Sequence, residues 1–236
     1  MIIESKYRST PLYGIISIDK KKFNDCDLFK GDMWKYAVLK KIQIWWGTPL
    51  KNENLPKMKT LIGIKCSYKN IMTGEEKVIA HCGNISGNDI DVKEISVEKG
   101  DYFNQFHIGF DTNISYIKFS TKDNKQIEYG ERIDGEYKTI NLNYETEPNM
   151  VQCLIGYYNE NRISALGCKY IKKKDYIFLN LMDIFRLRHL FKYNEEIKKK
   201  WSDKNQLDKC NLIIKALAKL CLLPDAQFYS IIKYFA

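Results

Sequence analysis

Four polar residues in a row, Asn159 to Arg162, stand between two apolar runs that are rich in Tyr and Ile. Their amide, carboxylate and guanidinium groups are strong hydrogen-bonding groups, and a tight polar loop between aromatic strands is a common place to hold a sugar. The same pattern is also typical of a hairpin turn that binds nothing. The loop is therefore a candidate binding site with two open interpretations.

Other groups capable of chemistry are sparse. The two Asp-x-Asp pairs, Asp25–Asp27 and Asp89–Asp91, supply fewer oxygen ligands than a calcium loop needs. Aspartate is also common in turns, where its side chain bonds to the nearby backbone and binds no metal. His81 and Cys82 are adjacent, but a nucleophile pair depends on placement by the fold. The sequence carries no nucleophile elbow, phosphate-binding loop or metalloprotease helix. We therefore predict that the protein is not an enzyme and has no metal site and no cofactor.

Two further patterns indicate possible interaction surfaces. Trp45 and Trp46 are neighbours, and because adjacent side chains of a strand point to opposite faces, one ring should enter the core. The other is a candidate anchor for a protein partner, unless the C-terminal tail covers it. Basic and aromatic residues alternate at 170–176 and 197–201, which could contact nucleic acid or a membrane. Short lysine runs are more often solvated helix ends, so we do not expect a nucleic-acid partner.

Length and composition indicate an ordinary globular chain. The 236 residues correspond to one full-sized domain, or one domain with a small extension, and 44% are hydrophobic and 28% charged. Residues 173–236 hold 13 Lys/Arg and 7 Asp/Glu, so they carry +6 of the net charge of +9. The sequence shows no signal peptide and no transmembrane segment. We expect a cytoplasmic or intracellular, non-secreted protein whose seven cysteines are reduced and mostly buried.

Short alternating or β-branched runs, separated by Gly, Asn and Asp, occupy the chain up to about residue 171. Many short strands without an intervening helix predict an antiparallel sandwich, barrel or prism. The predicted strands are Leu39–Trp46, Leu61–Tyr68, Lys77–His81, Ile95–Val97, Phe106–Phe110, Tyr116–Ser120, Thr139–Leu142, Cys153–Tyr158 and Ala165–Ile171.

The spacing of apolar residues changes from about Asp175, after which they recur at the intervals of a helix. We predict helices over Ile177–Phe191, after a capping box at Asp203–Gln206, and near the C-terminus. The chain thus divides into a β-domain, residues 1–172, and an α-helical C-terminal extension, residues 173–236. An extension of this size is marginal alone, so it should pack on the β-domain or on a partner. The apolar residues of its last helix that we expect to contact a partner are Phe228, Ile232 and Phe235.

The order and spacing of the strand motifs resemble the jacalin-like lectin family over roughly residues 11–171. The matching pieces are Gly14 with Phe23-Asn24-Asp25, Ile42–Ile44 with Gly47, Leu61–Ile64 with Tyr68, His81–Gly83 with Gly87, Ile95–Val97 with Gly100–Phe103, Ile117, Phe119 and Thr121 with Tyr129-Gly130, and Gly156–Tyr158 with Ala165–Gly167. The resemblance implies a mainly β fold, a jacalin-like β-prism of three antiparallel sheets around one core, without catalytic activity. It does not extend to the helical tail.

The resemblance also implies where a sugar would bind. Lectins of this family use an opening glycine turn, backbone N–H groups of the final hairpin loop, and an aspartate that closes the pattern Gly-x-x-x-Asp. The corresponding residues are Gly14, Asn159, Glu160, Asn161 and Ser164. Ser164 stands at the aspartate position, and a serine cannot accept two charge-assisted hydrogen bonds from adjacent hydroxyls as a carboxylate does. Glu160 stands at the glycine position.

These departures favour a non-catalytic interaction or scaffold protein, a structural subunit that docks through its helical tail to other protein subunits of an intracellular assembly. Two alternatives stay open. The first is a functional lectin that binds mannose-type or galactose-type glycans. The second is a basic peripheral protein whose lysine clusters bind acidic surfaces.

Overall fold

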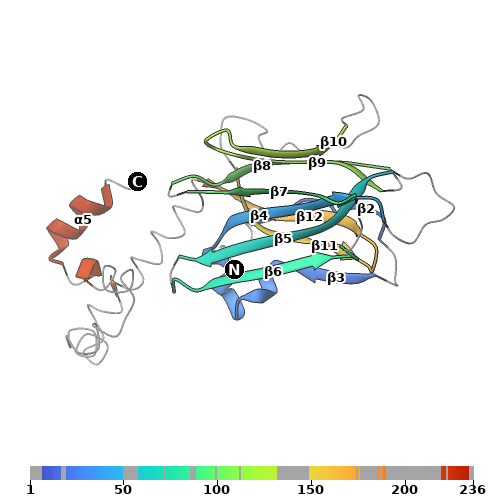
Figure 1. The fold of residues 1–236 in the computed structure, drawn as a ribbon. Helices are drawn as coiled ribbons and strands as arrows, with labels where there is room; N and C mark the ends of the chain where they lie inside the picture. The colour runs from blue at the N-terminus through green and yellow to red at the C-terminus, as the bar shows by residue number, and fades with distance from the viewer. Residues whose placement is uncertain are drawn as a thin grey trace.

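The computed structural model describes residues 7–16, 20–49, 58–71, 73–85, 89–98, 100–111, 113–131 and 149–173, together with 175, 185, 188–189, 219–221 and 223–233 of the C-terminal part. Within these residues the chain is mainly β and forms three antiparallel sheets (Figure 1). Side chains from all three sheets meet in one hydrophobic core. This arrangement is the β-prism that the sequence motifs predicted.

The first sheet joins the two ends of the β-domain. Its strands are β1 (Arg8–Ser9), β12 (Ile163–Lys172), β11 (Asn149–Tyr158) and β3 (Lys21–Asn24) in that order, with β2 (Tyr13–Gly14) also paired to β12. β11 and β12 form an antiparallel hairpin that ends at the pair Tyr158↔Ile163. The polar loop singled out in the sequence therefore closes this hairpin.

The other two sheets are built mostly from strands that are neighbours in sequence. The second sheet has the order β6 (Glu76–Cys82), β5 (Thr60–Asn70), β4 (Ala37–Gly47) and β7 (Asp91–Ser96). The third has the order β10 (Gln126–Gly130), β9 (Ile114–Thr121) and β8 (Phe103–Phe110). Two 3₁₀ helices, η2 (Asp25–Leu28) and η3 (Gly31–Tyr36), connect β3 to β4.

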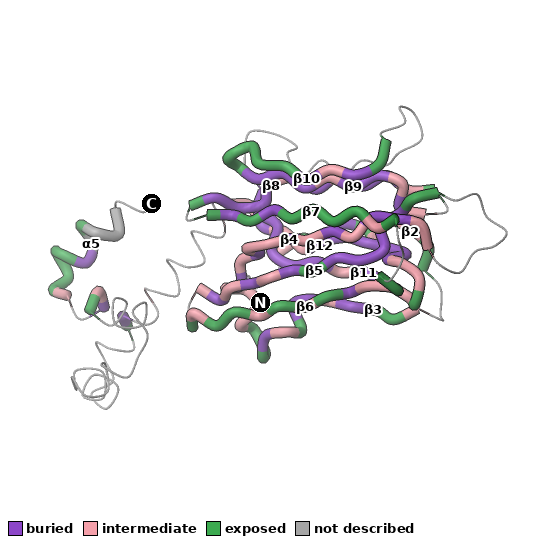
Figure 2. The backbone as a smooth tube through the Cα atoms, in the orientation of Figure 1, coloured by how far each residue is buried: buried purple, intermediate pink, exposed green. Residues whose placement is uncertain are grey.

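The strands form because every second side chain enters the core. In β4, Ile42 and Ile44 are fully buried, while Lys41 and Gln43 are only half-buried on the opposite face. In the third sheet, the rings of Phe106 and Phe119 stack with their centroids 4.8 Å apart. Figure 2 shows the buried residues concentrated along the strands of the prism. Each fully buried large side chain stabilises the fold by about 1.5–3 kcal/mol.

Most of the strand predictions are confirmed, with longer bounds. The strand predicted at Ile95–Val97 is the exception, since β7 begins at Asp91 and ends at Ser96. β1, β2, β3 and β10 were not predicted because each is short. They contribute few buried core residues: none in β1 and β2, Phe23 in β3, and Ile127 with Tyr129 in β10. The strand predicted at Thr139–Leu142 lies outside the described residues.

The described part of the C-terminal extension contains α5 (Asp225–Lys233). Phe228 of this helix is buried, with its ring edge-on to Phe185 at 5.5 Å between centroids and the Arg188 guanidinium 4.0 Å above it. Arg188 also donates to the Cys221 carbonyl at 2.9 Å and pairs with Asp225 at 2.6 Å. The extension thus has a small packed centre of its own.

The rest of the extension stays at the level of prediction. The helices predicted over 177–191 and after Gln206, the Phe235 side chain and the Ile232 side chain lie largely or wholly outside the described residues. The division between residues 172 and 173 likewise stays a prediction. Among the residues that are described, no helix is long and apolar enough to cross a membrane.

Candidate functional site

Asn159 organises the loop that closes the β11–β12 hairpin. Its backbone N–H donates to the Arg162 carbonyl at 3.0 Å. Its side-chain oxygen accepts from the backbone N–H groups of Asn161 at 3.0 Å and Arg162 at 3.1 Å. Asparagine favours such turns because its side chain can satisfy the backbone that follows it. The N–H groups of Asn159, Asn161 and Arg162 are therefore already bonded within the loop.

The end of β6 clamps this loop from the side of the second sheet. The Asn84 N–H donates to the Glu160 carbonyl at 2.6 Å. Gly83 lies against the loop so closely that a Cβ at this position would clash with the backbone of Asn161 and Arg162. Only glycine permits this approach, so the sequence His81-Cys82-Gly83 fixes the loop between the first and second sheets.

Gly14 and Ser164 lie together, as the resemblance implied, but they contact each other. Gly14 has a φ of +125°, and a Cβ there would clash with the carbonyl oxygen of Ser164. That carbonyl accepts from the Ile15 N–H at 2.9 Å. The Ser164 side chain is buried, with 4% of the residue exposed, and its hydroxyl donates to the Tyr157 carbonyl at 3.2 Å. On this flank the polar groups are used by the fold itself.

An open pocket of about 510 Å³ lies on the other flank, beside β11 and β3. It is lined by Lys21, Cys82, Tyr158, Asn159, Glu160 and Asn161. The strand register explains the first of these residues, because Lys21 pairs with Tyr158 across β3 and β11. The pocket therefore collects residues from three strands and the hairpin loop.

The lining offers both donors and acceptors to a polar ligand. Lys21 supplies an ammonium, Glu160 an exposed carboxylate, and Asn161 an amide that can donate and accept. Tyr158 adds an aromatic ring. Burial raises the pKa of the Cys82 thiol, so this group is a neutral thiol at neutral pH. A neutral thiol is a weak nucleophile, and the lining is suited to binding a ligand.

A buried polar network backs the pocket wall. Asp25, 1% exposed, accepts from the Tyr68 hydroxyl and lies 2.7 Å from Nε2 of His81. Burial and the Asp25 charge raise the pKa of Tyr68 well above its ordinary value, so its hydroxyl stays a donor. The ring of Phe23 stacks on His81 with centroids 3.8 Å apart. A buried carboxylate requires such partners, and the network holds β6 in place directly behind Cys82.

The two tryptophans lie on opposite faces of β4, as expected. Trp46 is buried and stacks parallel to Tyr129 with centroids 5.6 Å apart. Trp45 is half-buried on the outer face of the second sheet. Phe228, the third predicted partner contact described, is buried in the extension.

Sequence reasoning found the loop residues and missed the rest of the pocket. Lys21 and Cys82 lie far from the loop in sequence, and Tyr158, which directly precedes the loop, was expected only as a strand residue. Asp25, His81 and Cys82 were considered as metal or nucleophile candidates, and Tyr68 only as part of a family motif. Among the described residues, no group of three His, Cys, Asp or Glu side chains is placed to hold a metal ion.

Comparison with known proteins gives fold neighbours. No protein-family model and no curated protein match the sequence. Malaysian banana lectin has 14% identity and a TM-score of 0.49, covering 70% of this chain and 99% of that chain. The mannose-binding lectin from champedak has 12% identity and a TM-score of 0.49, covering 70% and 96%. Calystegia sepium agglutinin has 14% identity and a TM-score of 0.47, covering 70% and 97%.

Proposed function

We propose that the protein is a carbohydrate-binding lectin whose ligand occupies the pocket beside β3, and not the family position between Gly14 and Ser164. The observation that carries this proposal is the 510 Å³ pocket with Lys21, Glu160 and Asn161 around the Tyr158 ring. Ligand sites combine an aromatic surface with a few polar groups that fix orientation. This lining has that composition.

Glu160 takes over the chemical task of the missing aspartate. A carboxylate can accept charge-assisted hydrogen bonds from two adjacent hydroxyls, and Glu160 is exposed where it lines the pocket. Lys21 can donate to a third oxygen of the same ring. The family position lacks an equivalent acceptor, because the Ser164 hydroxyl is buried and bonded to Tyr157.

A pair of variants tests this placement. Glycan-array binding followed by calorimetry should find a sugar ligand for the wild type. Glu160→Gln should weaken binding by about ten- to a hundredfold, since hydrogen bonds to a charged group contribute about 1.5–3 kcal/mol. The matched variant Ser164→Ala should leave affinity within about twofold, because its hydroxyl serves the hairpin. Binding that depends on Ser164 and ignores Glu160 would return the site to the family position.

A protein-binding role at the same end of the prism is the second candidate. Ile15, Ile16 and Ile85 are 40%, 55% and 46% exposed beside the hairpin loop, and exposed apolar side chains can anchor a protein partner. Ile16→Asp should then dissociate a complex seen by native mass measurement of the protein from its source. A monomer in that measurement would contradict this candidate.

The remaining sequence-based hypotheses stay predictions. Docking of a scaffold through the helical tail, an assembly of protein subunits and an intracellular location have no further support. Binding to acidic surfaces depends on lysine clusters, of which 197–201 lies outside the described residues. In the other cluster, Lys173 lies over the Tyr102 ring at 5.1 Å from its centroid.

A further inference from the structure

The outer face of the second sheet carries an aromatic side chain next to the pocket. Trp45 lies over Gly63, where a Cβ would come within 3.0 Å of Cε3 of the indole and 2.5 Å of the Cys82 Cβ. Gly63 is buried although it faces outward. The missing side chain thus lets the indole settle onto the sheet.

These residues form one continuous row across four strands. The cross-strand pairs are Val92↔Trp45, Trp45↔Gly63 and Gly63↔Cys82. Val92 is 45% exposed at one end, and Cys82 lines the pocket at the other. Three steps between neighbouring strands make the row roughly 14 Å long. The row therefore leads from the pocket onto the open face of the sheet.

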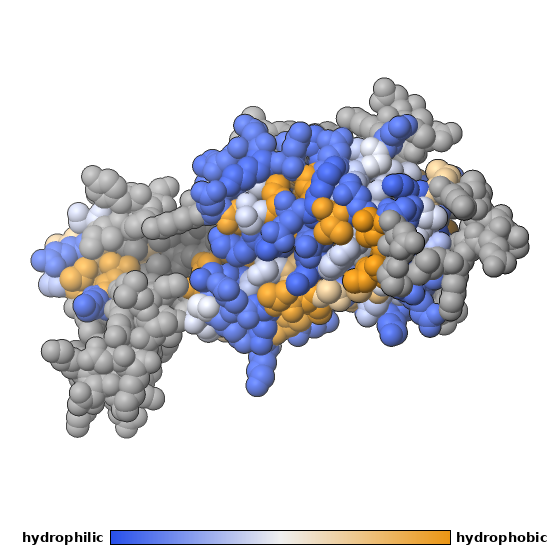
Figure 3. Space-filling model, viewed as in Figure 1, coloured by the Kyte–Doolittle hydropathy of each residue, from blue (hydrophilic) through white to orange (hydrophobic). Residues whose placement is uncertain are grey.

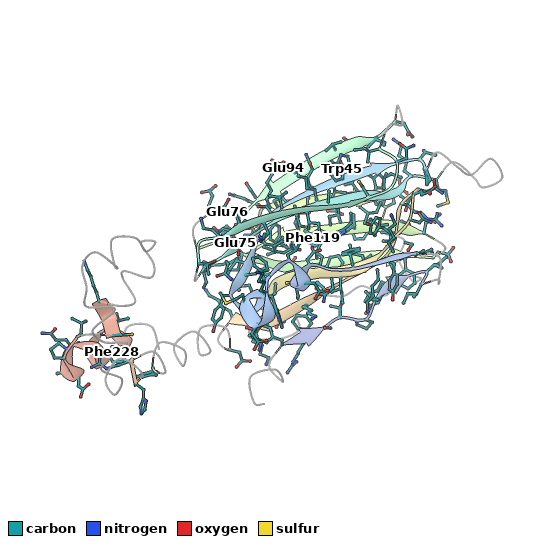
Figure 4. The ribbon with its side chains drawn as sticks, turned by 90° about the horizontal axis from the view of Figure 1, so that it is seen from below. Trp45, Glu75, Glu76, Glu94, Phe119 and Phe228 are labelled. Carbon is teal, nitrogen blue, oxygen red and sulfur yellow. The ribbon has the colours of Figure 1, made fainter. Side chains whose placement is uncertain are left out.

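A second hollow adjoins this row. It has a volume of about 300 Å³, and its lining includes Gln43, Lys65, Ser67 and Glu94. Gln43 pairs with both Lys65 and Glu94 in the row next to Trp45. Figure 3 shows hydrophilic and hydrophobic residues interspersed on the side of the molecule that this sheet occupies. Figure 4 shows Trp45 and Glu94 on neighbouring strands at one side of the prism, with Phe119 in its middle.

We infer that this face is an extended subsite, and that the ligand is an oligosaccharide of several units in place of a single sugar. One unit lies in the pocket, the next lies flat on Trp45, and the following one reaches the hollow at Gln43. The inference rests on the proposed lectin function and adds the length of the ligand and its path.

The chemistry of the face selects a glycan as occupant. An indole presents an electron-rich face, which attracts the polarised C–H groups on the apolar face of a sugar ring. The adjoining amide, ammonium, hydroxyl and carboxylate groups match ring hydroxyls. Because the indole lies against the backbone of Gly63, little side-chain freedom is lost on binding.

The test compares ligand lengths. A printed array carries mono-, di-, tri- and tetrasaccharides of mannose and of galactose, and calorimetry follows each hit. Wild-type affinity should rise with length. Trp45→Ala should lower tri- and tetrasaccharide affinity about five- to tenfold and leave the monosaccharide within about twofold. Trp45→Phe should restore part of the loss.

Two more variants and the possible outcomes complete the design. Gln43→Ala tests the hollow without removing packed surface, and Lys69→Ala, an exposed change on β5 outside the row, is the matched control. Thermal unfolding checks that every variant is folded. If sugars bind but affinity ignores both length and the changes at Trp45 and Gln43, the subsite is overturned while the lectin function stands. If no sugar on the array binds, both proposals fall.

Discussion

The two flanks of the β11–β12 hairpin use similar polar groups for different ends. On the β2 flank, the Ser164 hydroxyl donates to the Tyr157 carbonyl and the Ser164 carbonyl accepts from the Ile15 N–H. Gly14 packs against Ser164. On the β3 flank, Lys21 and Glu160 line an open pocket. The difference teaches that one hairpin can present a packed edge on one flank and an open pocket on the other.

The largest loss of stability should come from disrupting the contact between Gly83 and the hairpin loop. Gly83→Ala places a Cβ against the backbone of Asn161 and Arg162. Such overpacking should lower the free energy of unfolding by about 2–3 kcal/mol and abolish sugar binding, as measured by urea unfolding and calorimetry. Gly31→Ala is the control, since nothing lies within 4 Å of its Cβ and its left-handed backbone costs about 1 kcal/mol. Equal losses in both variants would refute the clamp.

The next largest loss of stability should come from disrupting the buried network of Asp25 and Tyr68 behind the pocket. Tyr68→Phe removes the hydroxyl that donates to the buried Asp25 and accepts from the Leu154 N–H at 3.3 Å. Because a buried carboxylate loses a partner, unfolding should become easier by about 2 kcal/mol. Tyr116→Phe is the matched control, because its hydroxyl donates to Glu128, whose side chain is 41% exposed, and should cost less than about 1 kcal/mol.

Tyr68 should also make the free energy of unfolding depend on pH. Burial and the Asp25 charge raise the pKa of Tyr68 in the folded state, so the unfolded state loses this proton first. The Tyr68 contribution is therefore complete below about pH 10, the ordinary value for tyrosine, and declines as the pH rises above it. Urea titrations between pH 8 and 11 should show a shallower decline for Tyr68→Phe than for the wild type. Parallel curves would mean that Tyr68 ionises equally in both states.

Two alanine variants in the hairpin loop should distinguish the residue that stabilises the loop from the residue that contacts the ligand. Asn159→Ala removes the acceptor for two backbone N–H groups and should cost about 1 kcal/mol in unfolding experiments. Asn161→Ala, in the same loop, should leave stability within about 0.5 kcal/mol and weaken sugar binding. The reverse pattern would show that Asn161, and not Asn159, holds the loop.

The smallest expected difference is in the rate at which cysteines on the two flanks are chemically modified, which needs no mutation. Cys82 lines the pocket and is only partly buried, whereas Cys168 on β12 is fully buried. Burial raises the pKa of both thiols, so labelling should be slow at neutral pH and faster as the pH rises. Iodoacetamide at pH 8.5 should modify Cys82 first among the described cysteines, and bound sugar should protect it. Equal rates at Cys168 would mean that the β2 flank opens as readily.

Sequence reasoning predicted those parts of the fold that repeat a local pattern. The pattern of β4 was sufficient to predict the strand at Leu39–Trp46 and to place Trp45 and Trp46 on opposite faces of it. The sequence also identified Ser164 and Glu160 as departures from the family pattern. It could not say that the Ser164 hydroxyl turns back to Tyr157, because that depends on the backbone of the neighbouring strand.

The pocket was beyond prediction for a related reason. Lys21 and Cys82 reach it only through the strand register, in which Lys21 pairs with Tyr158 and Cys82 pairs with Gly63. Register between strands distant in sequence is set by packing of the whole core. The proposed subsite depends in the same way on the register that pairs Trp45 with Gly63.

The pairing of β12 with β1 and β2 has a consequence for biosynthesis. Arg8 lies opposite Tyr170 and Gly14 opposite Ala165, so the first sheet cannot close until nearly the whole β-domain has left the ribosome. The second and third sheets form from strands closer in sequence, and domains rich in long-range pairing fold slowly. We expect the nascent chain to acquire these two sheets first, and its hairpin loop and pocket only at the final step of co-translational folding.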